Sequence, residues 1–433
     1  MDVPDVRYAW SADTAIAYQV TGEGPPDLVM VPFLANLYTL WQAPGFARLA
    51  RRLATGRQLV LVNPRGVGLS DRPRGFTVES RMDDIRAVID DLGSERPALL
   101  GLAEGSASCA VFAASYPDRV ERLLLFNPWA RGTADPQARL SALAGIPEEQ
   151  ATWGRREVLL AHARRINPQW ADDPEYLEWF IWHHRLTSSP AAWADFRRMQ
   201  IELDITGVLP AIRVPTLVIS KDSFRAEAEA VARGIPGAEH VVVPGLGAAF
   251  HENEFAAEAV EKFLAGDTQR HVPDTVLATI LFTDLVGSTE QAAALGDRAW
   301  RDLLERHQAI VRLELERFRG TELDTAGDGF FASFDGPART IACARAIAER
   351  LPELGLAVRA GIHTGECERV GDKLAGIAVN VGARVSAAAG PGEILVTSTV
   401  KELVAGSGIE FDDRGAHALK GIPGEWRLYG VAS

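Results

Sequence analysis

Short, strongly apolar runs separated by helix-patterned segments are the feature that most constrains this chain. The runs lie at residues 28–31, 59–62, 98–100, 123–126, 216–219 and 240–243. Helical patterns lie between them, for example at 46–54, 80–92 and 106–116. Apolar strands that alternate with helices are buried on both faces. The first part of the chain is therefore predicted to form a mostly parallel α/β sheet with helices on both sides.

Two segments break this alternation and predict the domain organisation. Between Trp129 and Leu209 the sequence is helical and rich in tryptophan. This predicts a helical cap, about residues 130–209, over the C-terminal edge of the sheet. The stretch 266–275 is polar, contains Gly and Pro and has no apolar periodicity, so we predict a linker there. The expected domains are residues 1–265 and 276–433.

The second part has a different order of elements. Its patterns predict strands at 275–282, 357–363, 394–397 and 426–431, a hairpin at 322–334, and helices at 290–318, 337–350 and 377–388. Strand pairs mixed with helices indicate an α+β domain in which helices pack against one sheet.

Charge and cysteine usage exclude several classes of protein. The 433 residues carry a formal net charge of −13, and neither part is basic. This argues against a nucleic acid or an anionic membrane surface as the main partner. The cysteines, Cys109, Cys343 and Cys367, lie far apart without CxxC spacing, which fits a reducing compartment. We find no signal-peptide pattern and no apolar run of about 18 residues, so we expect a cytoplasmic protein without a membrane span.

Two short acidic motifs in the second part carry candidate chemistry. In the first, FTDLVGST, a strand ends in Asp284 and a helix opens at Gly287, Ser288 and Thr289. Exposed backbone N–H groups at such a helix start attract phosphate. The second, DTAGDG, places Asp328 at a tight glycine turn. Carboxylates at the ends of adjacent strands could hold two divalent ions, although either Asp alone could simply cap a turn or a helix.

With three further motifs, these segments resemble class III nucleotidyl cyclases over roughly residues 274–431. VRAGIHTG begins at Val358, NVGAR at Asn380 and LKG at Leu419, in the order of the family. The resemblance implies a ferredoxin-like domain that binds two Mg²⁺ or Mn²⁺ ions per site. By this resemblance, Asp284, Asp328 and the Leu285 carbonyl bind the metal ions. Arg359 and Lys420 bind the triphosphate. Asn380 orients the ribose, and Arg384 stabilises the charge on the α-phosphate.

The residue types fit these implied roles. Asn380 and Arg384 are four residues apart, so on a helix they share one face. A guanidinium is planar and permanently cationic, which suits a negative charge spread over phosphate oxygens. The resemblance further implies a head-to-tail homodimer in which one protomer supplies the aspartates and the other supplies Asn380 and Arg384.

One departure from the family pattern leaves the purine open. Members that use ATP usually have a lysine four residues before the second metal aspartate and an aspartate seven before the ribose asparagine. Here these positions hold Asp324 and Lys373, with the charges exchanged. The pair suits adenine or guanine; alternatively, its members bond to each other and read no base. We expect conversion of ATP to cyclic AMP and pyrophosphate, with GTP to cyclic GMP as the alternative.

The first part resembles α/β-hydrolases over roughly residues 5–264, but without their catalytic residues. NPRGVGLSD begins at Asn63, GLAEG occupies the place of the nucleophile elbow, and Asp222 lies near the position of the acid. The elbow serine is replaced by Ala103 and the histidine by Ala248. Acyl transfer needs both a nucleophile and a base, so this resemblance implies the fold without the chemistry.

Several alternatives remain for the first part. A shifted dyad of Ser106 and His251 would make the protein an active esterase with a vestigial cyclase domain, but Ser106 would lie inside a helix, away from the elbow. The domain is otherwise either a regulatory module that senses a small apolar ligand under the cap or a purely structural or dimerising domain. The sequence favours neither of these two hypotheses over the other. A nucleotide- or lipid-sensing scaffold is the remaining non-enzymatic hypothesis.

Overall fold

The computed structural model describes residues 3–25, 27–250, 253–266, 275–370 and 373–432. The chain divides into two units, Met1–Pro273 and Asp274–Ser433. Most of the linker predicted at 266–275 falls on residues 267–274, which lie outside the described residues. Each unit is treated by itself below.

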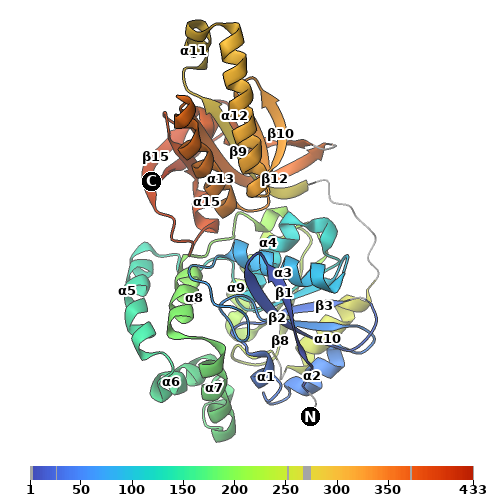
Figure 1. Cartoon of the computed structure of the whole chain (residues 1–433). Coiled ribbons are helices and arrows are strands. Elements are labelled where there is room, and N and C mark those ends of the chain that lie inside the picture. Colours follow the sequence, from blue (N-terminus) through green and yellow to red (C-terminus); the bar gives the residue numbers. More distant parts are fainter. Residues whose placement is uncertain (1–2, 26, 251–252, 267–274, 371–372, 433) are drawn as a thin grey trace. The chain divides into compact units, whose positions relative to one another are not determined.

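In the described part of the first unit, one eight-stranded sheet runs in the order β1-β2-β4-β3-β5-β6-β7-β8 (Figure 1). The predicted strands are confirmed as β3 (Leu28–Val31), β4 (Leu59–Val62), β5 (Ala98–Leu102), β6 (Leu123–Phe126), β7 (Thr216–Lys221) and β8 (Glu239–Val243). These six strands are parallel to one another. The pattern missed β1 (Val6–Ser11) and β2 (Thr14–Thr21), which pair antiparallel at the edge. Exposed residues in β1 interrupt the apolar run that marks the inner strands.

Helices cover both faces of this sheet, as predicted. They are α1 (Leu37–Leu40), α2 (Phe46–Leu53), α3 (Val78–Leu92), α4 (Gly105–Ser115), α9 (Arg225–Gly234) and α10 (Glu254–Ala265). Helix α2 packs against α10, and α3 packs against α4. Strands β3, β4 and β6 are buried along their whole length, because side chains on both of their faces meet helices.

Four helices occupy the segment between β6 and β7 where the cap was predicted. They are α5 (Pro136–Thr152), α6 (Arg156–Ile166), α7 (Pro174–Thr187) and α8 (Pro190–Glu202), which pack as α5 with α8 and α6 with α7 (Figure 1). Three of them start with proline after a residue whose side chain caps the helix: Asp135, Asp173 and Ser189. Proline suits the first helical position because its missing N–H would have no helical partner there.

The second unit is α+β, as predicted. Within its described residues one sheet runs in the order β10-β11-β9-β12-β14-β16-β15, with β13 paired to β12. The strands are β9 (Thr275–Leu285), β10 (Thr321–Ala326), β11 (Gly329–Phe334), β12 (Val358–Val370), β13 (Lys373–Ala375), β14 (Ile394–Thr397), β15 (Phe411–Ala418) and β16 (Glu425–Val431). Helices α13 (Pro337–Arg350) and α14 (Ile377–Ala388) have the predicted bounds, whereas α15 (Ser398–Leu403) and β15 were not predicted.

The prediction of one long helix over 290–318 is wrong. The segment forms two helices, α11 (Ser288–Leu295) and α12 (Asp297–Arg317), on either side of Gly296. Gly296 has a φ of 78°, a left-handed conformation that a continuous right-handed helix does not allow and that glycine adopts without steric cost. The apolar periodicity on each side hid the break.

Alternate residues of β9 and β12 face different helices. Leu281 and Leu285 join the core under α12 and α13, whereas Ile280 belongs to the cluster on the α14 side. Helix α14 approaches β12 closely at Gly361, where an added Cβ would lie 2.0 Å from the Ser386 amide nitrogen. The glycine of the Arg-x-Gly-Ile-His sequence is therefore needed to seat α14, the helix that carries Asn380 and Arg384.

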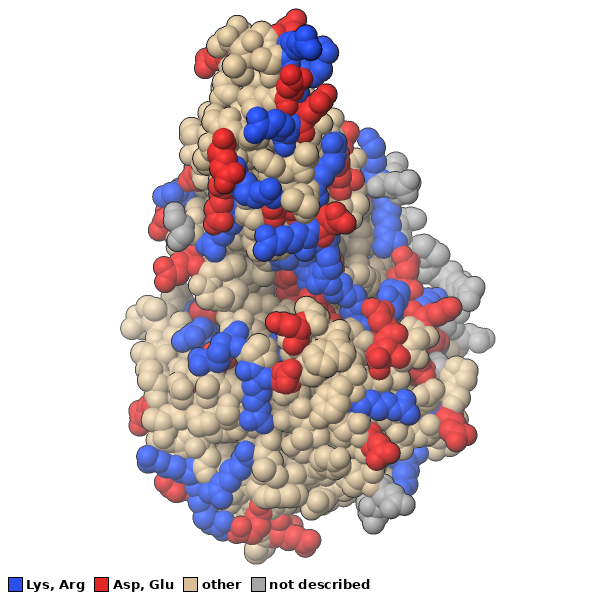
Figure 2. All heavy atoms as spheres, in the orientation of Figure 1, with Lys and Arg blue, Asp and Glu red and all other residues tan. Residues whose placement is uncertain are grey.

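Among the described residues, no helix combines the length and apolar character that crossing a bilayer requires. On the face shown in Figure 2, basic and acidic side chains are interspersed.

Gly361 provides a test of this packing. Gly361→Ala should lower the free energy of unfolding of the second unit by about 1–3 kcal/mol, because the new methyl group meets helix backbone that must move. Gly390→Ala is the matched control, since its Cβ would meet only the end of the Glu393 side chain at 3.4 Å. Urea unfolding followed by circular dichroism measures both. Equal stabilities of the two variants would contradict the proposed close approach.

Candidate functional site

The two acidic motifs meet at one end of the second sheet. Asp284 lies near the end of β9, and Asp328 lies in the turn that joins β10 to β11. Phe330 of β11 pairs with Thr283 of β9, so continuing this antiparallel register places Asp284 opposite Gly329, next to Asp328. The two carboxylates thus belong to adjacent strand ends, as the sequence predicted.

Asp284 is engaged by an arginine in this structure. Arg359 is the cross-strand partner of Asp284, and its guanidinium donates from Nε to Asp284 Oδ2 at 3.1 Å and from Nη2 to the same oxygen. The side chains are about one-third exposed, at 33% for Arg359 and 37% for Asp284. The carboxylate at this sheet end therefore already attracts a positive charge.

Asp328 has the environment expected of a cation ligand. Its Oδ2 is buried and has no hydrogen-bond partner among the described residues. His307 of α12 is fully buried nearby, and burial lowers its pKa to about 4 despite the opposing charge of Asp328, so the imidazole is neutral at pH 7. An unpartnered carboxylate oxygen is costly to bury, and a divalent ion would satisfy it.

The rest of the metal environment is sparse. No group of three or more His, Cys, Asp or Glu residues suited to a metal lies within the described residues. A metal held here would take ligands from two aspartates, from backbone oxygen such as that of Leu285, and from the substrate.

Asp324 and Lys373 lie together. Lys373 Nζ is 3.6 Å from Asp324 Oδ2, and both side chains are more than 60% exposed, at 63% and 61%. Exposed ion pairs of this kind contribute only about 0–1 kcal/mol, so a ligand could replace the contact at little cost. Phe331 pairs with Asp324 across the hairpin and stacks on Phe282 with ring centroids 4.6 Å apart. The sequence analysis did not identify this aromatic pair, because the two rings come from strands whose register only the structure shows.

The structure does not bring the other predicted residues to the aspartates. Asn380 and Arg384 are exposed on α14, and neither side chain contacts a carboxylate among the described residues. Lys420 is exposed in the connection between β15 and β16. Gly287, Ser288 and Thr289 open α11; Gly287 has a φ of 70°, and no side chain caps the helix. Among the described residues, no hydrogen bond or ion pair joins Asn380, Arg384 or Lys420 to the two aspartates.

In the first unit, the nucleophile elbow is preserved without its nucleophile. Ala103 has a φ of 52°, the strained conformation that such an elbow requires. Cβ atoms added at its neighbours Gly101 and Gly105 would lie 2.5 Å from Ser106 Cα and 2.3 Å from the Val31 carbonyl oxygen. The geometry of the turn is thus intact, while its central side chain is a methyl group.

No described group replaces the missing triad. Ser106 is buried and donates its hydroxyl to the Gly101 carbonyl at 2.9 Å. Asp222 is half exposed and ion-paired with Arg225 at 2.8 Å. Ala248 donates its backbone N–H to the Ile166 carbonyl. His251, the other member of the alternative dyad, lies outside the described residues.

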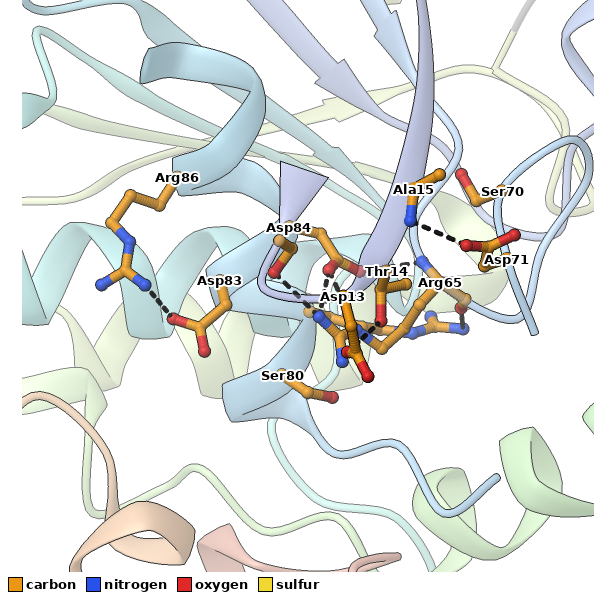
Figure 3. A network of polar contacts seen from close by, with 12 residues as sticks. Asp13, Thr14, Ala15, Arg65, Ser70, Asp71, Ser80, Asp83, Asp84 and Arg86 are labelled. Carbon is orange, nitrogen blue, oxygen red and sulfur yellow. Dashed lines mark hydrogen bonds and ion pairs between the residues drawn. The ribbon is translucent and has the colours of Figure 1, made fainter. Parts of the chain in front are cut away.

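The loop that begins at Asn63 has a structural role. Arg65 binds Asp84 through its backbone N–H at 2.8 Å and its Nη2 at 2.6 Å, and Asp71 accepts the Ala15 N–H at 2.8 Å (Figure 3). Asn63 donates its amide to the Ala35 carbonyl at 2.9 Å. These contacts fix the loop to β2 and α3 and need no catalytic explanation.

A cavity of about 940 Å³ lies between the elbow and the cap. Ala103 and Ala248, which replace the nucleophile and the base, both line it. Most of its other lining side chains are aromatic or apolar, and three are histidines that the sequence analysis missed: His162, His183 and His184. The available signal for His183 and His184 was the aromatic and histidine-rich stretch WFIWHH that begins at Trp179.

Comparison with known proteins decides the family. Residues 33–180 match the family model described as the α/β hydrolase fold, and residues 272–433 match the model described as the adenylate and guanylate cyclase catalytic domain. The chain is a fusion of an α/β-hydrolase-fold domain with a class III cyclase catalytic domain. Both resemblances seen in the sequence are confirmed at this level.

Individual relatives cover one domain each. An adenylate cyclase of Lachancea kluyveri is 29% identical over 157 residues, which is 29% of this chain and 8% of that protein. A 2-(acetamidomethylene)succinate hydrolase of Mesorhizobium japonicum is 28% identical over 233 residues, 51% of this chain and 80% of that protein. The enol-lactonase of Burkholderia xenovorans LB400 is 24% identical, with a TM-score of 0.52 over 60% of this chain and 100% of its own, which shows the fold alone.

The chain spans only part of the first curated relatives that it matches. It covers 26% of the cyclase relative from Rhizobium meliloti and 34% of the hydrolase relative from Caulobacter.

The buried histidines of the hydrolase-fold domain predict a pH dependence of stability. Burial lowers the pKa of His183 to about 4, and its ring bonds to Thr39 Oγ1 at 2.6 Å and to the Leu34 carbonyl at 3.3 Å. The unfolded chain binds the proton more tightly than the folded chain does. The contribution of the neutral His183 ring to the free energy of unfolding is therefore complete above about pH 6.5 and is lost as pH falls towards 4. For one such histidine the decrease in the free energy of unfolding approaches about 3 kcal/mol.

His183→Gln should therefore reduce the loss of stability between pH 7 and pH 5. Burial also lowers the pKa of His162 and of His184, so part of the dependence will remain. Denaturant unfolding followed by tryptophan fluorescence suits this measurement, because Trp179 stacks on His183 with ring centroids 4.8 Å apart. His417→Gln in the other domain is the control. Identical pH profiles for wild type and His183→Gln would contradict the prediction.

Proposed function

We propose that this protein is an adenylate cyclase that converts ATP to cyclic AMP and pyrophosphate at composite sites of a homodimer. The observation that carries the proposal is the pair of aspartates at one end of the sheet. Asp284 is ion-paired with Arg359, and Asp328 has a buried oxygen without a partner among the described residues. The match of residues 272–433 to the cyclase catalytic family supports the same assignment.

In this proposal the chain's residues position the nucleotide and stabilise charge. Asn380 orients the ribose so that its 3′-oxygen attacks the α-phosphorus as pyrophosphate leaves. Arg384 stabilises the negative charge that develops on the α-phosphate, and Lys420 binds the triphosphate. Phosphoryl transfer depends mainly on such positioning and charge stabilisation. Asp284, Asp328 and the Leu285 carbonyl would hold Mg²⁺ or Mn²⁺, which when bound lowers the pKa of the 3′-hydroxyl and neutralises phosphate charge.

Arg359 has two roles in this proposal. Without nucleotide it neutralises Asp284, to which it donates two hydrogen bonds. With nucleotide bound it turns to the triphosphate, and Asp284 becomes free to hold a metal ion. Gly287, Ser288 and Thr289 would add backbone N–H groups at the uncapped start of α11.

The base is read by Asp324 and Lys373 in this proposal. Their exposed contact at 3.6 Å is weak enough to open for a purine, which would then bond to both side chains. Adenine offers an N6–H donor to Asp324 and the N1 acceptor to Lys373. Guanine also offers donors and an acceptor to the same pair, so a guanylate cyclase is the second candidate.

The separation of the site residues favours a homodimer. Asn380 and Arg384 lie on α14 and contact neither aspartate within the described residues of the chain. A second copy that brings its own α14 to the aspartates would complete the set. The hydrolase-fold domain is then a regulatory module with a cavity for a small apolar ligand. An active esterase is disfavoured, since Ala103 and Ala248 stand where nucleophile and base belong.

The first experiment offers ATP and GTP separately to the purified chain with Mg²⁺ or Mn²⁺ and measures both cyclic products. Cyclic AMP should predominate. Asp284→Ala and Asp328→Ala should each lower the rate at least about 100-fold, the scale of losing one electrostatic contact to the transition state. Asp302→Ala, an exposed change on α12, is the matched control. Activity of either aspartate variant within about threefold of wild type would refute the assignment.

The second experiment tests the shared site. Asp284→Ala and Arg384→Ala should each be inactive alone, yet their mixture should recover activity. A mixed dimer keeps one intact site beside one doubly damaged site, so random mixing should restore about a quarter of the wild-type rate. Differently tagged chains and a pull-down verify that subunits have exchanged. Exchange without recovered activity would exclude composite sites.

A further inference from the structure

Two histidines that line the cavity under the cap each have a buried ring nitrogen without a partner among the described residues. His162 Nε2 and His184 Nε2 are both buried, and neither has a hydrogen-bond partner among the described residues. Both rings line the cavity, with centroids 5.9 Å apart and planes at 75°. Buried polar atoms are normally hydrogen-bonded, so this pair of nitrogens is a place where a ligand would supply what the protein lacks.

In each ring, the hydrogen bond of Nδ1 determines whether Nε2 is a donor or an acceptor. His184 Nδ1 lies 2.9 Å from the Phe180 carbonyl oxygen, which only accepts, so Nδ1 carries the hydrogen and Nε2 has the lone pair. Arg165 Nη2 donates to His162 Nδ1 at 3.0 Å, so in the neutral ring His162 Nε2 carries the hydrogen. The cavity thus offers one donor and one acceptor, on neighbouring rings.

The surroundings favour a neutral ligand. Burial lowers the pKa of His162 to about 4, and burial also lowers the pKa of His184 well below its usual value, so both rings are neutral at pH 7. Two of the arginines that line the cavity are ion-paired, Arg197 with Glu149 and Arg131 with Asp204. Arg165, which donates to His162, is itself exposed. A charged head group would lose its hydration in the cavity without an equivalent partner deep inside.

The walls favour an apolar body. Trp153 stacks on Trp193 with ring centroids 4.1 Å apart, and His184 stacks on Phe180 at 3.7 Å. The volume of about 940 Å³ is at the upper end of the roughly 300–1,000 Å³ typical of small-molecule sites.

We infer that this cavity binds a neutral, largely apolar small molecule whose single head group both donates and accepts a hydrogen bond, as a primary carboxamide or a hydroxyl does. His162 Nε2–H donates to the head group, and His184 Nε2 accepts from it. The ligand is bound and released without a bond being formed or broken. The inference rests on the proposed role of the hydrolase-fold domain as a ligand-binding module and names the class of ligand.

The test compares three probes of the same shape on the full chain: phenylbutanamide, phenylbutanoate and butylbenzene. Calorimetry and tryptophan fluorescence give the dissociation constants. The amide should bind about tenfold more tightly than butylbenzene, the scale of two neutral hydrogen bonds, and more tightly than the carboxylate. Equal binding of amide and butylbenzene would overturn the inference, as would no binding of any probe at millimolar concentration. Tighter binding of the carboxylate would overturn the neutral head group and assign the site to Arg165.

Variants locate the head group. His162→Phe and His184→Phe keep a ring and remove both nitrogens, so the advantage of the amide should fall to within about threefold while butylbenzene binding stays unchanged. His240→Phe is the matched control, because His240 bonds to Ser220 in the sheet and does not line the cavity. An unchanged amide advantage in both cavity variants would overturn the assignment.

These readouts do not depend on catalysis. If the amide binds as expected but cyclase activity does not respond to it, the ligand site holds and the regulatory role fails. If no nucleotide is cyclised by any preparation, the binding results still decide the inference.

Discussion

The ion pair between Asp284 and Arg359 is the interaction on which the cyclase domain's site depends. It joins the two central strands, β9 and β12, at the sheet end where Asp328 also lies. Asp284 and Asp328 lie at adjacent strand ends, so the guanidinium also offsets the repulsion between two like charges. The guanidinium therefore offsets negative charge at this sheet end, and in the proposed function it is the residue that turns to the triphosphate.

Small residues at close contacts do comparable work in both domains. Gly361 lets α14 rest on β12, and Gly101 and Gly105 let the elbow turn pass close to α4 and β3. At the elbow the strained conformation of Ala103 persists although no nucleophile uses it. Glu104, the next residue, is buried and ion-paired with Arg81, and a buried pair of this kind is costly to break by removing one partner. The elbow is thus held by packing and charge pairing that do not require hydrolysis.

The hydrolase-fold domain encloses a cavity beside its elbow turn. Ala103, Ala248 and three buried or half-buried histidines line this cavity, and two of these histidines each have a ring nitrogen without a partner among the described residues. Buried polar atoms without partners reduce the free energy of unfolding, and the proposed ligand would offset this cost.

Sequence by itself determined the two folds and the order of the domains, and it predicted the residues of the candidate site. Buried parallel strands appear in the sequence as continuous apolar runs. The ordered motifs around Asp284, Asp328, Arg359 and Asn380 indicate one family. Sequence did not reveal the break at Gly296, because the helical period continues on both sides of a single left-handed residue. Tertiary structure alone decided that Arg359 binds Asp284, that Lys373 reaches Asp324, and that His162 and His184 face one cavity. These contacts join segments that are far apart in the chain, or they depend on the direction in which a side chain points. Local sequence patterns encode neither the long-range contacts nor the side-chain directions.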